Sequence, residues 1–161
     1  MDCFTLFAMT VYLILSILYM GSSKFSLIVP TLNRAKDLAH FLDMLLKLDQ
    51  MPYELIIVDQ SDDEESKKIC ESVQYKNLTI SYHHIVKKSS AVARNVAIER
   101  LSPESDYVVF LDDDTTLDTD FLDQIEHFFV HHPHAQGGVA NIESPLRKIS
   151  LLKKIGIFLL T

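Results

Sequence analysis

Short apolar runs separated by polar or helical segments repeat along the chain from residue 25 onward. Four runs are rich in residues that favour strands, at residues 25–29, 54–59, 78–83 and 107–111. Each is short and is followed by a polar segment, as expected for strands in a folded sheet. The pattern therefore predicts four strands.

Four helices are expected between and after these strands. The first has apolar residues at the three- and four-residue spacing of one buried helical face: Leu38, Phe41, Leu42, Leu45 and Leu46. The others are expected at residues 62–71, from a cap at Ser89 or Ser90 to about Leu101, and at residues 120–130. In the last helix the residues expected to point inward are Phe121, Ile125, Phe128 and Phe129. Strands alternating with helices favour an α/β fold with a mainly parallel, Rossmann-like sheet and helices on both faces.

A different pattern precedes the first strand. Residues 4–20 contain no charged residue over 17 positions, at the short end of what spans a bilayer. We expect residues 1–21 to form a hydrophobic membrane-anchor helix; the alternatives are a signal peptide and a buried core helix. A signal peptide would begin with basic residues, where this chain has Asp2. Lys24, Arg34 and Lys36 follow the segment, so an anchored domain is expected to face the cytoplasm.

The rest of the chain is expected to form one domain at residues 22–145 and a short tail at residues 146–161. A length of 161 residues suits one domain with a core and is too short for two of ordinary size. On a helical projection of the tail, one side is basic or polar and another is apolar. The first side carries Arg147, Ser150 and Lys154, and the second carries Leu151, Leu152, Ile155 and Leu159. Such a basic amphipathic segment can lie on an anionic membrane, or it can be a core helix cut short.

The formal net charge of −7 is unevenly distributed. Between Leu101 and Leu146 there are ten Asp and Glu residues and no Lys or Arg, which leaves fifteen basic and twelve acidic residues elsewhere. A local negative field attracts cations and repels phosphates, so no nucleic-acid partner is expected. Cys3 and Cys70 have neither metal-ligand nor redox spacing, which suits a reducing compartment.

Polar residues follow three of the four expected strands. The sequence "PTLNR" at residues 30–34 follows the first, Asp59 begins the polar stretch after the second, and three consecutive aspartates at 112–114 follow the fourth. Ligands of α/β sheets bind beyond the carboxyl ends of the strands. We therefore expect these three segments to converge on one crevice.

The positions of the glycines exclude the common phosphate-binding loops. The chain has four glycines: Gly21, Gly137, Gly138 and Gly156. None of them lies in the loop directly after the first strand. Neither G-x-G-x-x-G nor a phosphate loop ending in Gly-Lys-Ser or Gly-Lys-Thr is therefore possible in that loop. Phosphates at this site would instead need a divalent metal ion. Asp112 and Asp114 offer the hard oxygen ligands that Mg²⁺ or Mn²⁺ prefers, with a diphosphate completing the shell.

Four segments together resemble a known family: "SLIVPTLNR", "ELIIVDQSDD", "SSAVARNVAIE" and "VVFLDDD". In this order and spacing they resemble the nucleotide-binding half of glycosyltransferase family 2, which has the glycosyltransferase A-type fold. The resemblance covers about residues 25–142. It implies an enzyme that transfers a sugar from a nucleotide-diphosphate sugar, most simply a UDP-sugar, to an unknown glycan, lipid or protein acceptor.

The resemblance also implies roles for particular residues. The loop after the first strand and the Asp after the second hold the base and ribose, which here are Thr31, Asn33, Arg34 and Asp59. Arg94, in the "ARN" element, would lie near the base or the diphosphate.

In the triple aspartate, the resemblance implies that Asp114 is the main metal ligand. Asp112 is the second candidate ligand, and Asp112 or Asp113 would lie nearer the sugar and ribose. The implied reaction is direct displacement at the anomeric carbon, in which a base removes the acceptor's proton while the metal and Arg94 neutralise the departing diphosphate.

The chain departs from the family pattern in two places. Lys88 and Ser89 stand where many members have a Gly before the "ARN" element. After Glu126 the only acidic residue is Glu143, which comes too early to match the family's catalytic base. No base is therefore assigned, and we expect either a fragment or a transferase-like remnant that transfers sugar slowly.

Two other interpretations fit parts of the sequence. Asp112-x-Asp114-x-Thr116 after an apolar strand also fits the nucleophile motif of haloacid-dehalogenase-type phosphatases. The missing base favours a second alternative, a non-catalytic module that binds nucleotide sugars. The histidines at positions 131, 132 and 134 could hold a transition metal, but a polar turn after a helix explains them more simply.

Overall fold

A computed structural model describes residues 23–72, 78–140 and 157–160 of the chain. The expected membrane anchor at residues 1–21 lies outside this part. The strands are β1 (Phe25–Thr31), β2 (Glu54–Asp59), β3 (Thr79–His84), β4 (Tyr107–Phe110), β5 (Gly137–Val139) and β6 (Ile157–Leu160). The helices are α2 (Ala35–Leu45), α3 (Glu65–Ser72), α4 (Ser90–Ile98) and α5 (Phe121–His131). All four predicted strands and all four predicted helices are present, with ends within a few residues of those expected.

The strands form one sheet in the order β3-β2-β1-β4-β6-β5. The pairs β1–β2, β2–β3 and β1–β4 are parallel, whereas β6 runs antiparallel to both β4 and β5. The prediction of a mainly parallel sheet is confirmed. Because β2 and β3 extend to one side of β1 and β4 lies on the other, the winding of the sheet reverses between β1 and β4, where α/β sheets open a ligand crevice.

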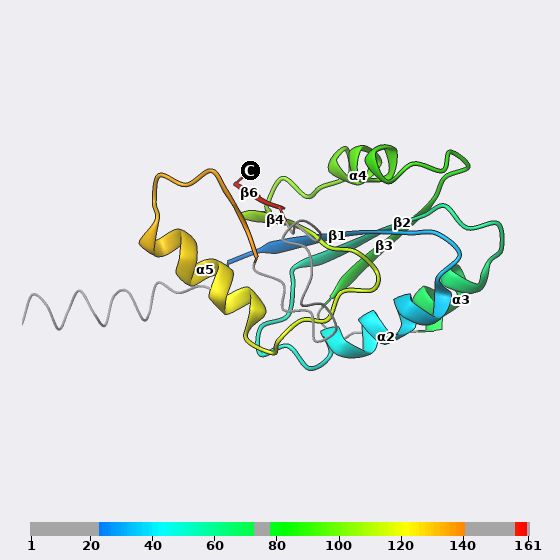
Figure 1. Ribbon diagram of the computed structural model, residues 1–161, viewed down its shortest axis with the longest axis horizontal. Coiled ribbons are helices and arrows are strands. Elements are labelled where there is room, and N and C mark those ends of the chain that lie inside the picture. Colours follow the sequence, from blue (N-terminus) through cyan, green and yellow to red (C-terminus); the bar gives the residue numbers. More distant parts are fainter. Residues whose placement is uncertain (1–22, 73–77, 141–156, 161) are drawn as a thin grey trace, which may run out of the picture.

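Helices cover both faces of the sheet, as predicted. Figure 1 shows α4 on one side of the strands and α2, α3 and α5 on the other. The larger core joins the α2 and α5 residues to one face of the sheet, with Phe25, Leu27 and Leu55 fully buried. The smaller core packs Ala93 and Ala97 of α4 against the opposite face. Alanine has the smallest side chain after glycine, so α4 can lie close to the strands.

Two residues expected in the core are exposed. Leu46 is 57% exposed because α2 ends at Leu45 and the chain turns away there. Phe128 is 38% exposed, whereas Leu122, which was not expected to point inward, is 1% exposed. The buried face of α5 consists of Leu122, Ile125 and Phe129. Ile125 and Phe129 are buried as predicted, whereas Leu122 takes the buried position that was expected for Phe121.

The last described residues differ from the helical tail that was expected. Ile157–Leu160 form strand β6, which pairs with β4 through Tyr107↔Leu160 and Val109↔Phe158. The rest of the expected tail, residues 146–156 and 161, lies outside the described residues. In the part of the chain that the structure describes, no helix is long and apolar enough to cross a membrane.

The amino ends of the strands are held by contacts distant in sequence. The Lys24 amide donates to Oδ2 of Asp106 at 2.8 Å, and Gln50 Nε2 donates to the Ser23 carbonyl at 3.1 Å. Ser23 also donates from its hydroxyl to Glu126 on α5. The first described residues are therefore fixed at the amino ends of the strands, away from the carboxyl ends of β1 and β2.

Candidate functional site

The carboxyl ends of β1 and β4 are joined by a buried hydrogen bond. Thr31, the last residue of β1, donates from Oγ1 to Oδ2 of Asp113 at 2.7 Å. Both residues are buried, with exposed fractions of 2% for Thr31 and 5% for Asp113. Asp113 is therefore the inward-pointing member of the triple aspartate, anchored in the fold, while Asp112 and Asp114 flank it at the surface.

Arg34 binds two of the three aspartates. Its Nη1 atom donates to Oδ1 of Asp113 and to Oδ2 of Asp114, both at 3.1 Å. These contacts raise the pKa of Arg34, mainly through the hydrogen bond to Asp113. Burial raises the pKa of Asp113, while the hydrogen bonds from Thr31 and Arg34 oppose that rise. The guanidinium thus compensates for a carboxylate that the fold has removed from water.

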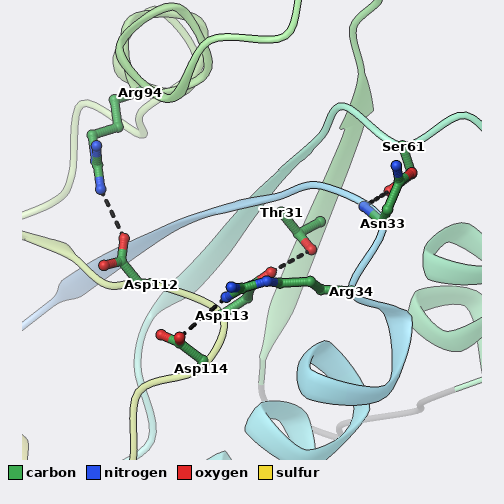
Figure 2. Close-up of polar contacts among 8 residues, drawn as sticks. All are labelled: Thr31, Asn33, Arg34, Ser61, Arg94, Asp112, Asp113 and Asp114. Carbon is green, nitrogen blue, oxygen red and sulfur yellow. Dashed lines mark hydrogen bonds and ion pairs between the residues drawn. The ribbon is translucent and has the colours of Figure 1, made fainter.

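Arg94 binds the third aspartate from the opposite side. Its Nη2 atom donates to Oδ1 of Asp112 at 2.9 Å, and Nη1 donates to Ser90 one turn earlier on α4. Ser89 caps this helix, since its hydroxyl accepts from the Val92 amide. Figure 2 shows Arg94 extending from α4 and Arg34 from the start of α2 toward neighbouring aspartates.

Asp59 is more deeply buried than expected for a residue that contacts a ligand directly. It is fully buried, its Oδ2 accepts from Tyr82 at 2.6 Å, and its Oδ1 accepts from the Ser61 amide at 2.8 Å. Burial is the main cause of the raised pKa of Tyr82. In this arrangement Asp59 holds the loop after β2 in position. A direct contact between Asp59 and a ligand stays a prediction.

Asn33 connects the loop after β1 to the loop after β2. It has a positive φ of 54°, a left-handed conformation that asparagine tolerates better than most residues. Its amide donates to the Ser61 hydroxyl at 2.7 Å, and its side-chain oxygen accepts from the Asp62 amide at 3.0 Å. Lys88 Nζ donates to Oδ1 of Asp62 at 2.6 Å and lowers the pKa of that carboxyl. The loops after β1, β2 and β3 are thereby tied together.

Three residues that connect these loops and strand ends were not assigned roles from the sequence. Gln60 is buried and donates to the carbonyls of Lys87 and Ser89, Ser61 binds Asn33, and Tyr82 binds Asp59. The polar "QSDD" run gave a signal for Gln60 and Ser61. Tyr82 lies within a strand pattern and gave none.

The two candidate metal ligands are near each other and partly exposed. The side chains of Asp112 and Asp114 are 47% and 35% exposed. Within residues 23–72, 78–140 and 157–160, no three His, Cys, Asp or Glu side chains form a group that could hold a metal ion. Two carboxylates fit Mg²⁺ or Mn²⁺, which commonly take one or two carboxylates and complete the shell with phosphate oxygens and water.

The histidines at the end of α5, which are His131, His132 and His134, belong to no such group within the described residues. His131 Nδ1 lies 2.8 Å from the His127 carbonyl oxygen, and the rings of these two residues are 4.0 Å apart. His132 is the C-cap of the helix, and its backbone amide donates to the carbonyl oxygens of Phe128 and Phe129. These contacts are those of a helix terminus.

The fold and the site together define a class of protein. A mainly parallel α/β sheet with carboxylates and arginines at its switch point is typical of proteins that bind nucleotides beyond the strand ends. The model of glycosyl transferase family 2 matches residues 26–159, and the chain belongs to this family. The phosphatase interpretation is therefore wrong.

Similar proteins include two bacterial proteins and several solved structures. Poly(ribitol-phosphate) β-N-acetylglucosaminyltransferase TarS of Staphylococcus aureus is 30% identical over 112 residues, which cover 68% of this chain and 19% of TarS. The minor teichoic acid biosynthesis protein GgaA of Bacillus subtilis is 29% identical over 116 residues, 68% of this chain and 26% of GgaA. This chain therefore spans about a fifth to a quarter of the length of these relatives.

The fold matches those of solved glycosyltransferases. A crystal structure of S. aureus TarS 1–349 in complex with UDP-GlcNAc superposes with a TM-score of 0.66 and 27% identity, over 79% of this chain and 37% of that chain. A mannosyltransferase from Pyrobaculum calidifontis, in complex with GDP-Man and Mn²⁺, superposes with a TM-score of 0.59 and 23% identity, over 68% of this chain and 33% of that chain. The second similarity shows the fold alone. The expected glycosyltransferase A-type architecture is confirmed.

Proposed function

We propose that this chain binds a nucleoside diphosphate sugar at the carboxyl ends of β1 and β4, as part of a glycosyltransferase. The observation that carries the proposal is the convergence of Arg34 and Arg94 on Asp112, Asp113 and Asp114. Arginine side chains suit a diphosphate, and paired carboxylates suit its counter-cation. The relatives support a uridine nucleotide as the first donor to test, because a structure of TarS contains UDP-GlcNAc.

The residues divide into two groups by their positions. Thr31 ends β1 and Asn33 lies in the loop after it, which is the proposed place for the base and ribose. Arg34 follows in the same loop, and its guanidinium, which contacts Asp113 and Asp114, is proposed to reach the diphosphate. Arg94 approaches from α4 and is proposed to contact the diphosphate. Asp59 holds the loop after β2 through the Ser61 amide, and the Ser61 hydroxyl accepts from the Asn33 amide, so Asp59 is proposed to affect binding indirectly.

Asp112 and Asp114 are the residues that would hold Mg²⁺ or Mn²⁺ together with the diphosphate. A bound divalent cation would neutralise charge that develops on the leaving diphosphate. Asp113 serves a different purpose, because Thr31 and Arg34 occupy both of its oxygens. It positions the two flanking carboxylates.

Titration calorimetry on the full chain tests the proposal. UDP and UDP-GlcNAc are titrated with Mn²⁺ and with a chelator, and GDP serves as the matched control for base selectivity. We expect UDP binding that requires Mn²⁺ and is weaker for GDP. Absence of binding by both nucleotides in the presence of Mn²⁺ would overturn the proposal.

We also propose that binding and transfer are separable in the 161 residues. No acidic residue after Glu126 matches the family's base by position, and Glu143, the only one present, lies outside the described residues. General-base assistance is typically worth about 10² to 10⁴ in rate. We expect clear UDP binding but transfer from a labelled donor far slower than that of TarS. Robust transfer would contradict this, and Glu143→Gln would then be the first variant to make.

A further inference from the structure

Two arginines form ion pairs with all three aspartates at residues 112–114 before any ligand is bound. Arg34 bridges Asp113 and Asp114, and Arg94 pairs with Asp112. The two side chains arrive from different helices and share no aspartate among these contacts. Both candidate cation ligands, Asp112 and Asp114, therefore have a guanidinium within hydrogen-bond distance (Figure 2).

These contacts place the arginines in competition with a cation. A divalent ion that takes Asp112 and Asp114 must share these two carboxylates with the hydrogen bonds from Arg94 to Oδ1 of Asp112 and from Arg34 to Oδ2 of Asp114. It also brings two positive charges close to two guanidinium groups, which are charged at all physiological pH values. Both effects lower the affinity of the protein for a cation that arrives alone.

A diphosphate reverses this competition. Guanidinium groups bind phosphate oxygens at least as well as carboxylates, through charge-assisted hydrogen bonds. The side chains of Arg34 and Arg94 are 49% and 34% exposed, so both can reach a ligand at the surface. An arginine that moves to a phosphate releases its aspartate to the cation.

We propose that Arg34 and Arg94 form an exchange lock that makes cation and nucleotide bind cooperatively. In the free protein they pair with Asp112 and Asp114 and suppress cation binding; when a nucleoside diphosphate binds, they transfer to its phosphates and free these two carboxylates. This inference rests on the proposed function. Because coupling between two ligands is reciprocal, the cation must strengthen nucleotide binding by the factor by which the nucleotide strengthens cation binding.

The test measures Mn²⁺ binding to the full chain by electron paramagnetic resonance at fixed ionic strength, without and with saturating UDP. The variants are Arg94→Gln and Arg34→Gln, each checked for folding by circular dichroism. Arg94→Gln is the cleaner variant, since Arg94 and Asp112 are both partly exposed, whereas Arg34 supports buried Asp113. Lys88→Gln is the matched control, because Lys88 is a cation at the same edge whose described partner is Asp62.

We expect the natural chain to bind Mn²⁺ alone weakly and at least tenfold more tightly with UDP. Losing one partly exposed ion pair should strengthen binding of Mn²⁺ alone by about two- to fivefold in Arg94→Gln, and should reduce the enhancement by UDP. Lys88→Gln should change Mn²⁺ binding less. The lock is refuted if Arg94→Gln and Arg34→Gln bind Mn²⁺ alone no more tightly than Lys88→Gln does.

The two proposals fail in different ways. If UDP binds neither with nor without Mn²⁺, the proposed function fails, while the measurement with Mn²⁺ alone still decides whether the arginines suppress cation binding. If UDP binds with Mn²⁺ but the arginine variants match the control, the proposed function stands and the lock fails.

Discussion

Thr31 and Asp113 join the two central strands of the candidate site through one buried hydrogen bond. The Thr31 hydroxyl at the end of β1 donates to the carboxylate that follows β4, across 82 positions of sequence. The acceptor is 5% exposed, so water can hardly replace the donor. This bond therefore links the stability of the fold to the geometry of the flanking aspartates.

Replacing Thr31 by Val should destabilise the protein and weaken nucleotide binding together. The change keeps the shape of the side chain but leaves an oxygen of Asp113 without one donor, a loss of about 1–3 kcal/mol for a buried charged acceptor. Urea denaturation followed by circular dichroism measures the free energy of unfolding. Thr31→Ser is the control, because it keeps the hydroxyl. Equal stability of Thr31→Val and the natural chain would show that Arg34 alone satisfies Asp113.

Asp114→Asn should remove most of the metal dependence of UDP binding. The substitution takes away one charge and one hard oxygen ligand of the proposed cation site, while leaving Asp113 and its bond to Thr31 unchanged. Titration calorimetry with Mn²⁺ and with a chelator measures the effect. Asp118→Asn, at another aspartate of the same loop, is the control and should retain the dependence. Similar UDP affinity with and without Mn²⁺ in the natural chain would remove the basis for assigning a metal to Asp114.

Cys70 should resist alkylation in the folded protein. Its side chain is 7% exposed, and burial raises the pKa of its thiol from 9.0 to about 12. At pH 8 the reactive thiolate is then about a thousandfold rarer than for an unperturbed thiol, and it increases about tenfold per pH unit. Mass spectrometry of iodoacetamide-treated Cys3→Ser protein, with and without urea, measures the protection. Labelling at the same rate in both conditions would show that Cys70 is accessible.

Membrane association by residues 1–21 stays a prediction of the sequence. If the 17 uncharged positions span a bilayer, the full chain should remain with membranes during carbonate extraction, whereas a chain that starts at Ser22 should be released. Protease protection in sealed vesicles then tests the proposed cytoplasmic orientation. Recovery of the full chain in the carbonate supernatant would contradict the anchor.

The order of strands and helices could be predicted because each element carries its own local pattern. Residues 55–58 are apolar and lie between Glu54 and Asp59, and the predicted strand at 54–59 has the observed ends. The buried face of α5 could not be fixed in the same way. Phe121 and Leu122 are adjacent apolar residues, as are Phe128 and Phe129, so two faces one residue apart have the same spacing. Packing against the sheet selects Leu122 and Phe129.

Contacts between distant segments could be predicted only as far as the fold dictates them. The convergence of the loops after β1, β2 and β4 follows from a parallel sheet. The pairing of Arg34 with Asp113 and Asp114 joins residues that are 79 and 80 positions apart, and no local pattern indicates it. Strand β6 was missed for the same reason, because its partner β4 lies far earlier in the chain.

The pairing of β5 and β6 indicates where a label or tag would affect ligand binding. Val139 pairs with Ile157, and Phe158 pairs with Val109, so residues 139 and 157 both lie toward the end of β4 that leads to the aspartates. Ser23 lies at the opposite edge. A fluorescent label or affinity tag placed near Ser23 should therefore leave ligand binding intact, whereas one attached at residue 139 or 157 would lie toward the proposed nucleotide-binding end of the strands. The amino ends of the strands, near Ser23, therefore suit immobilisation of the protein. The opposite end, where β5 and β6 approach the end of β4, should be left unchanged in engineered variants.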